Sequence, residues 1–180
     1  MDTQTLIYAL TAIVLAGQLW VFERQRQLLQ MELDWRRGEA IARFYQLCIR
    51  LASNFGRADG GGTLHTTVPI DQSFDADLLP EMSSAATRFA PLGPRAVRHL
   101  ITGSFLLGQY VRELQGLALV SKGDEQRVLL NLKLTRELVG RQLDHVAAEI
   151  PSALRWSHHG DRPFNFQKLC SDGGTRGGAV

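Results

Sequence analysis

The longest uncharged stretch of the chain lies at its amino end. No acidic or basic side chain occurs from Thr3 to Phe22, and charged residues return at position 23. Twenty helical residues extend about 30 Å, at ~1.5 Å each, which matches the hydrocarbon core of a bilayer. Tyr8 and Trp20 lie towards the two ends, where aromatic rings favour the headgroup region. We therefore expect residues 1–22 to form a transmembrane anchor.

The sequence argues against a cleaved export signal and leaves one other interpretation of this stretch open. A cleaved export signal needs a cationic start, a shorter apolar run and a small-residue cleavage site, whereas the only charge before the run is Asp2. The polar side chains of Gln4, Thr5, Thr11 and Gln18 favour a helix buried in protein. The alternative is thus a soluble helical binding protein whose first helix is buried in a partner.

The basic residues near the apolar run all follow it. Arg24, Arg26, Arg36 and Arg37 come after the run, and no Lys or Arg precedes it. Because basic flanks stay on the cytoplasmic side, we expect a single-pass protein of the inner (plasma) membrane with most of the chain cytoplasmic. This topology is similar to that of many small bacterial proteins with one membrane helix.

Small side chains recur along one face of the predicted anchor. Thr5, Ala9, Ala12 and Ala16 are spaced by four, three and four residues, which permits close approach of a second helix. Gln18 offers a hydrogen bond between neighbouring helices. We expect a homo-oligomer or a subunit of a membrane protein complex. In the alternative interpretation, alanine is simply common in transmembrane helices, and the Gln18 side chain extends to the lipid headgroups.

The helical pattern continues beyond the anchor. Residues 23–40 are highly charged and keep a narrow apolar stripe of Leu28, Met31 and Trp35, which predicts an exposed helical stalk with a second interaction surface. From Ile41 the apolar face widens up to Phe55, as in a helix packed into a core. We expect this half to begin a cytoplasmic helical bundle over residues 41–155.

Three further helices are expected to complete the bundle. Residues 56–75 are rich in glycine and short polar side chains and predict a flexible loop, and a short helix follows at about 80–89. Gly93 and Pro94 then start a heptad helix, and Gly123 separates it from a last helix ending near Pro151. So short a turn requires an antiparallel hairpin. The predicted fold is all-α.

Residues 156–180 contain five glycines and no apolar repeat, so we expect a mostly disordered tail in which Cys170 is exposed. Phe164, Phe166 and Leu169 are the residues of this tail that can dock on the bundle or on a partner. The potential metal ligands His158, His159, Asp161 and Cys170 match no zinc spacing, so a metal-dependent enzyme that uses the tail is only an alternative.

Composition and motifs argue against several other functions. The 20 basic and 18 acidic residues give a net charge of +2, too balanced for a nucleic-acid-binding face. Cys48 lies on an apolar helix face, where burial keeps the thiol unreactive. Ser104 lies on the core-facing side of a helix, and no strained GxSxG turn presents it as a nucleophile. His99 and His145 fall on polar faces. We expect no catalytic site and no cofactor, and a role in protein interaction as a scaffold, regulator, accessory subunit or self-associating membrane effector.

Overall fold

The computed structural model describes residues 2–60, 74–75, 77–117, 124–154 and 164–175. All regular elements in these ranges are helices and no strand occurs there, which confirms the predicted all-α class. The chain divides into two compact units, Met1–Glu39 and Ala40–Val180. The first helix, α1 (Thr3–Gly60), contributes residues to both units.

Helix α1 is uninterrupted because no proline occurs in it. Gly17 and Gly38 lie within it, and each weakens a helix by only about 1 kcal/mol relative to alanine. The helix also continues past residue 56, where a loop was predicted to begin, up to Gly60. The rest of that predicted loop, residues 61–73, lies outside the described residues.

The short predicted helix near residues 80–89 is in fact a series of short elements. Helix α2 (Leu78–Ser83) and helix α3 (Ala85–Arg88) are followed by a 3-10 helix, η2 (Ala90–Leu92). Gly93 then adopts a φ of 101°, a conformation that glycine tolerates best. Pro94 begins the next helix, where its missing N–H has no intrahelical role.

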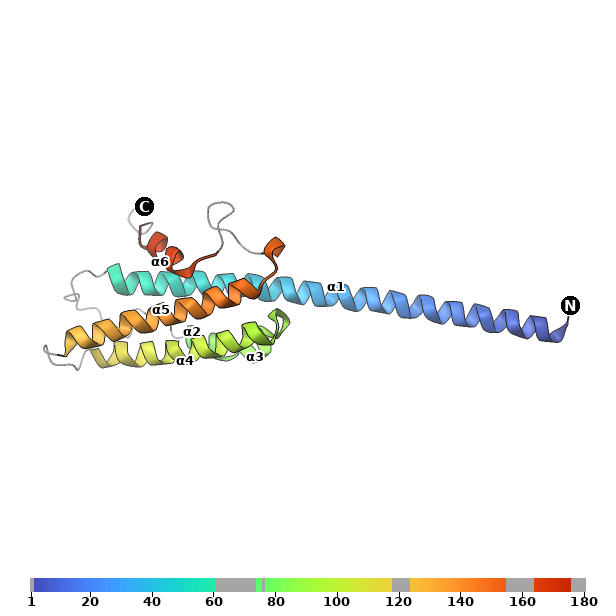
Figure 1. The fold of residues 1–180 in the computed structure, drawn as a ribbon, viewed down its shortest axis with the longest axis horizontal. Coiled ribbons are helices and arrows are strands. Elements are labelled where there is room, and N and C mark those ends of the chain that lie inside the picture. The colour runs from blue at the N-terminus through green and yellow to red at the C-terminus, as the bar shows by residue number, and fades with distance from the viewer. Residues whose placement is uncertain (1, 61–73, 76, 118–123, 155–163, 176–180) are drawn as a thin grey trace. The chain divides into compact units, whose positions relative to one another are not determined.

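Two long helices form the predicted hairpin. Helix α4 (Pro94–Leu117) and helix α5 (Glu125–Glu149) run side by side in opposite directions (Figure 1). The rings of His99 and His145 stack across the pair with centroids 4.9 Å apart. A further 3-10 helix, η3 (Ser152–Leu154), follows α5.

The core of the second unit is formed by α1 together with α2, α4, α5 and the last helix, α6 (Phe166–Thr175). Phe55 lies at its centre with no exposed surface. Its ring makes T-shaped contacts with Tyr110 of α4 at 5.0 Å and with Phe166 of α6 at 6.1 Å. The guanidinium carbon of Arg136 in α5 lies 5.6 Å from the same ring. One side chain of α1 thus contacts three other helices.

Helix α6 lies within residues 156–180, where a mostly disordered tail was expected. Phe166, Leu169 and Cys170 are all buried, and Phe164 packs against the core. Cys170, expected to be exposed, retains only 4% of its accessible surface. Burial of two aromatic rings offsets the entropy of ordering this short helix. Residues 156–163 and 176–180 of the predicted tail lie outside the described residues.

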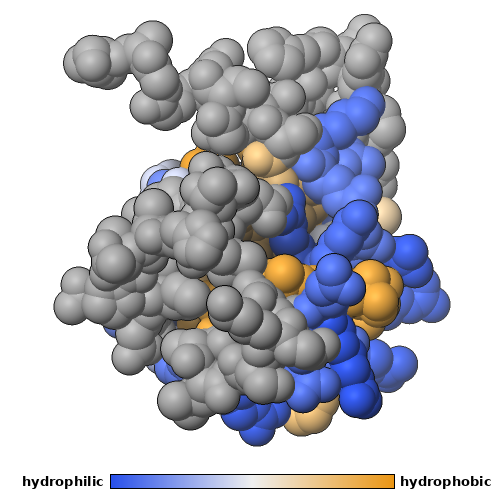
Figure 2. All heavy atoms as spheres, turned by 90° about the vertical axis from the view of Figure 1, so that its left-hand side faces the viewer, coloured by the Kyte–Doolittle hydropathy of each residue, from blue (hydrophilic) through white to orange (hydrophobic). Residues whose placement is uncertain are grey.

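The apolar stripe on the inner side of the hairpin is mostly buried. Leu100, Leu107 and Leu114 of α4 are buried, whereas Leu129 of α5 is 37% exposed. At the end of the bundle where α5 begins, the described surface is mostly hydrophilic, with a few hydrophobic side chains between polar ones (Figure 2).

We predict that Phe55→Ala destabilises the second unit by about 3–5 kcal/mol, because it removes a buried ring that three helices share. Urea unfolding followed by near-ultraviolet circular dichroism measures this loss in the full chain. Phe105→Ala is the matched control because Phe105 is 70% exposed, and its cost is expected to stay within about 0.5 kcal/mol. Equal costs for the two substitutions would contradict the central position of Phe55.

Candidate functional site

Large apolar side chains surround the amino-terminal part of α1 and remain exposed. Their exposed fractions range from 46% at Val21 to 74% at Tyr8. Successive residues of a helix are turned by about 100°, so apolar side chains at neighbouring positions 13, 14 and 15 cover very different directions. A helix that is apolar on all sides requires an apolar environment. The exposed large apolar residues are Ile7, Tyr8, Leu10, Ile13, Val14, Leu15, Leu19, Trp20, Val21 and Phe22.

Among the described residues, no helix is both long enough and apolar enough to cross a membrane. The side chains of Thr5 and Ala9, two members of the predicted small-residue face, lie outside the described set, and so does that of Leu6.

The other predicted residues of the anchor are exposed on α1. Ala12, Ala16 and Gln18 all present their side chains at the surface of this unit. The hydroxyl of Thr11 donates a hydrogen bond of 2.8 Å to the carbonyl oxygen of Ile7 in the preceding turn. This bond satisfies the hydroxyl within its own helix, so Thr11 adds little polarity to the apolar surface.

The predicted stalk surface is also exposed. Leu28, Met31 and Trp35 are 55%, 61% and 76% exposed. Leu29 and Leu33, spaced by four residues, are 61% and 65% exposed and form a second stripe that was not predicted. The stalk therefore offers apolar surface in two directions.

Charged side chains of the stalk pair along the helix. Arg36 donates to Glu32 at 2.5 Å, one turn away, and an Arg26 nitrogen lies 4.0 Å from a Glu23 oxygen. All four side chains are more than half exposed. Pairs of this kind add only a few tenths of a kcal/mol each and keep the stalk hydrophilic between its stripes.

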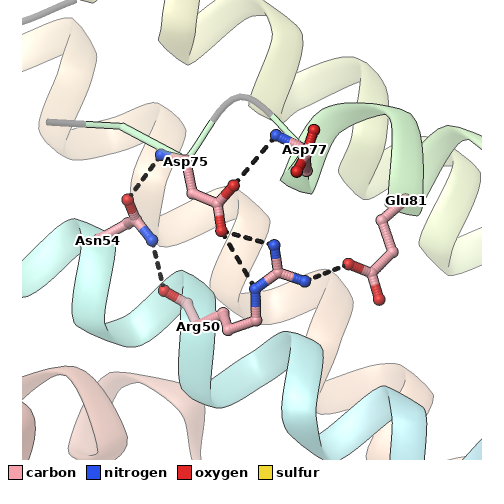
Figure 3. Close-up of polar contacts among 5 residues, drawn as sticks. All are labelled: Arg50, Asn54, Asp75, Asp77 and Glu81. Carbon is pink, nitrogen blue, oxygen red and sulfur yellow. Dashed lines mark hydrogen bonds and ion pairs between the residues drawn. The ribbon is translucent and has the colours of Figure 1, made fainter. Parts of the chain in front are cut away.

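A polar cluster around Arg50 attaches the segment before α2 to α1 (Figure 3). The Arg50 guanidinium donates two hydrogen bonds to one Asp75 oxygen, at 2.5 and 3.1 Å. Its third donor contacts Glu81 of α2 at 2.5 Å. The hydrogen bond to Asp75 raises the pKa of Arg50, against a smaller lowering by partial burial.

Asn54, one turn after Arg50, completes this cluster. Its amide nitrogen donates to the Arg50 carbonyl oxygen at 2.8 Å, and its amide oxygen accepts from the Asp75 backbone N–H at 2.8 Å. The Asp75 carboxylate in turn accepts from the backbone N–H of Asp77 at 3.1 Å. Each of these groups has a structural partner, so the cluster is a polar attachment point and offers no free nucleophile or acid.

Docking of α6 combines polar and apolar contacts. Asn165 precedes the helix and its side-chain oxygen accepts from the Lys168 N–H at 3.0 Å, as an N-cap residue does. The carboxylate of Asp144 in α5 accepts from the Phe166 N–H at 2.8 Å. The ring of Phe164 lies 5.4 Å from that of Tyr45. Phe164 directly before the capping Asn165 and Leu169 four residues after it form the pattern of a helix start. This pattern is the sequence signal that could have predicted α6.

Gly140 makes this docking possible. A Cβ atom at this position in α5 would lie 3.2 Å from Cδ1 of the Phe166 ring, closer than such contacts normally are. Because Phe166 is almost completely buried, its ring has little room to move.

The two cysteines are both free and buried. Burial raises the pKa of the Cys48 thiol well above its ordinary value, and the nearby Asp144 and Cys170 raise it further. A protonated, enclosed thiol is a poor nucleophile, as predicted for Cys48. The expectation that Cys170 is accessible was wrong, because α6 buries it.

The side chains of His99, His145 and Ser104 make contacts within the bundle. His99 is half-buried and its Nδ1 is hydrogen-bonded to Gln142 at 2.8 Å, while His145 is exposed. Ser104 is half-buried and donates to the Ile101 carbonyl oxygen at 2.8 Å. Among the described residues, no group of three or more His, Cys, Asp or Glu side chains can hold a metal ion. His158, His159 and Asp161 lie outside these residues.

Comparison with known proteins adds no family to these features. No family model matches the chain, and no curated protein or solved structure matches it.

We predict that Gly140→Ala loosens α6, although alanine alone favours a helix by about 1 kcal/mol over glycine. The added methyl group displaces the Phe166 ring, and Cys170 then reacts faster with a thiol reagent. Gly116→Ala in α4 is the control, because a Cβ at Gly116 meets nothing within 4 Å. Unchanged Cys170 reactivity in Gly140→Ala would show that the close approach is not needed for docking.

We predict that Asp144→Asn stabilises the protein relative to wild type as the pH rises. Burial raises the pKa of Asp144, against smaller lowering by the Phe166 hydrogen bond and by His145. The folded state therefore binds its proton more tightly than the unfolded state, whose pKa is about 3.9. This contribution to stability is present below that value and is lost as the pH rises through the higher folded-state pKa.

Asparagine keeps an oxygen acceptor for Phe166 without a buried charge. The difference in unfolding free energy, mutant minus wild type, should therefore increase as the pH rises from about 4, the unfolded-state pKa, through the higher folded-state pKa. Denaturant titrations at several pH values measure it. Asp77→Asn at an exposed position serves as the control. A difference that is constant with pH would contradict the assigned direction.

Proposed function

We propose that this chain is a single-pass membrane-anchored interaction protein. Its amino-terminal helix enters the bilayer, residues 23–40 form the stalk, and the helical bundle faces the cytoplasm. The observation that carries this proposal is the exposed apolar surface of α1 from Ile7 to Phe22. Such a surface is stable in hydrocarbon and is costly in water, at roughly 25 cal/mol per Å².

The charge pattern supports the same arrangement. Charged side chains begin directly after Phe22 and then recur throughout the stalk. The basic flank favours a cytoplasmic carboxyl-terminal side. The bundle buries its own core within Ala40–Val180, so the anchor is not needed to complete it.

Interaction is the role that the site chemistry favours. The described polar clusters hold helices together, and the apolar stripes of the stalk remain exposed. Leu28, Met31 and Trp35 are suited to contacts with another helix near the membrane surface. Ala12 and Ala16 favour close association within the membrane, as a homo-oligomer or with another subunit.

Alkaline carbonate extraction of membranes from cells that make the full chain tests the anchor. The wild type should stay in the pellet. Ile13→Arg should move a large fraction to the supernatant, because arginine at a span centre costs about 2.5–3.5 kcal/mol of insertion free energy. Gln25→Arg in the stalk is the control and should stay in the pellet. Release of the wild type would support the alternative, a soluble protein whose first helix is buried in a partner.

Cysteine-independent crosslinking in the same membranes tests self-association. Ala12→Ile adds bulk to the small-residue face and should reduce the crosslinked dimer, whereas Val14→Ile, on a different face, should not. Equal crosslinking of both variants would remove this face from the proposal and leave the anchor intact.

A further inference from the structure

A second exposed apolar surface lies on the α4–α5 hairpin, in the unit that does not contain the anchor. Phe105 of α4 is 70% exposed, and Leu130, Leu134 and Leu138 of α5 are 58%, 49% and 42% exposed. The three leucines are spaced by four residues and so form a row about 12 Å long on one side of α5. Buried core positions occur elsewhere on both helices, so these four side chains are not needed to close the core.

The register of the hairpin brings the two helices' exposed residues to the same level. His99 stacks on His145, and a Cβ at Gly103 would meet Gln142 at 3.5 Å. Because the helices are antiparallel, each turn forward along α4 corresponds to one turn back along α5. Phe105 is therefore level with Leu138.

Arginines border this surface in the same pattern on both helices. Phe105 has Arg98 seven residues before it and Arg112 seven residues after it. Leu134 likewise has Arg127 and Arg141 at seven residues on either side. A spacing of seven returns nearly to the same helix face, so an apolar centre lies between two cations on each helix.

Exposed basic side chains outnumber exposed acidic ones among the described side chains of the hairpin. Glu149 at the end of α5 and Asp124 just before α5 are exposed carboxylates, while Glu113, Glu137 and Asp144 are half-buried. The exposed cations are not paired with carboxylates of the described chain. They are Arg95, Arg98, Arg112, Arg127, Lys133 and Arg141.

We propose that the outer face of the α4–α5 hairpin binds an acidic amphipathic helix of another protein. The leucine row and Phe105 would contact the apolar face of that helix, and the bordering arginines would pair with its carboxylates. A second copy of the same hairpin is a poor occupant, because it would bring two cationic surfaces together. This proposal does not depend on where the amino-terminal helix lies.

Photocrosslinking in cells that make the full chain tests this surface. Phe105 or Leu134 is replaced by p-benzoylphenylalanine, and the crosslinked peptides are sequenced by mass spectrometry. Both positions should form adducts with the same segment of one partner, and that segment should carry acidic residues beside an apolar face. The same replacement at Ile49, which is 47% exposed on α1, is the control and should not capture it.

Charge reversal separates the specific complex from incidental contact. Arg98→Glu combined with Arg112→Glu should reduce the adduct at position 134 by about tenfold, because like charges would then face each other. Arg88→Glu, at an exposed position of α3, should leave the yield unchanged. The thermal unfolding midpoints of both variants should match the wild type, since the altered side chains are at the surface.

Four results would overturn the proposal. They are adducts with phospholipid, adducts with another copy of this chain, adducts with a segment that lacks acidic residues, and no adduct at positions 105 and 134. Equal adduct yields with and without charge reversal would also overturn it.

Discussion

The second unit depends on burial of one face of α1 between Ala40 and Phe55. Helices α4, α5 and α6 meet there around the Phe55 ring, and Met82 of α2 belongs to the same buried cluster. Apolar burial supplies the main driving force, and the T-shaped ring contacts fix the geometry in which these helices approach.

Helix α1 carries two very different surfaces along its length. Its large apolar side chains are exposed from Ile7 to Trp35, whereas the apolar face from Ala40 onward is buried. Backbone hydrogen bonds are the same throughout, so only the side chains distinguish the two halves. A helix needs a partner for every apolar face, and the second unit supplies one only beyond residue 40. This difference is the physical basis for proposing that lipid or another protein covers the first part.

Polar contacts decide how the shorter segments attach to this core. Arg50 and Asn54 hold Asp75 and α2, and Asp144 holds the start of α6. Each contact satisfies a charge or a backbone group that would otherwise be costly near the core. Such contacts orient the segments, while burial of apolar side chains supplies the main driving force. The hairpin surface around Phe105 differs because its cations have no carboxylate partner within the described chain.

Apolar spacing by itself determined the all-α class, the break at Gly93 and the long hairpin, because each is encoded by local periodicity and by glycine and proline. It also indicated the widening core face from Ile41. Residues 166–175 were expected to belong to a disordered tail, because a helix of ten residues gives little periodic signal. Only the tertiary structure showed that Gly140 leaves room for Phe166, that α6 buries Cys170, and that Arg50 meets Asp75 and Glu81. These contacts join residues far apart in the chain, and their existence depends on packing geometry that no local pattern contains.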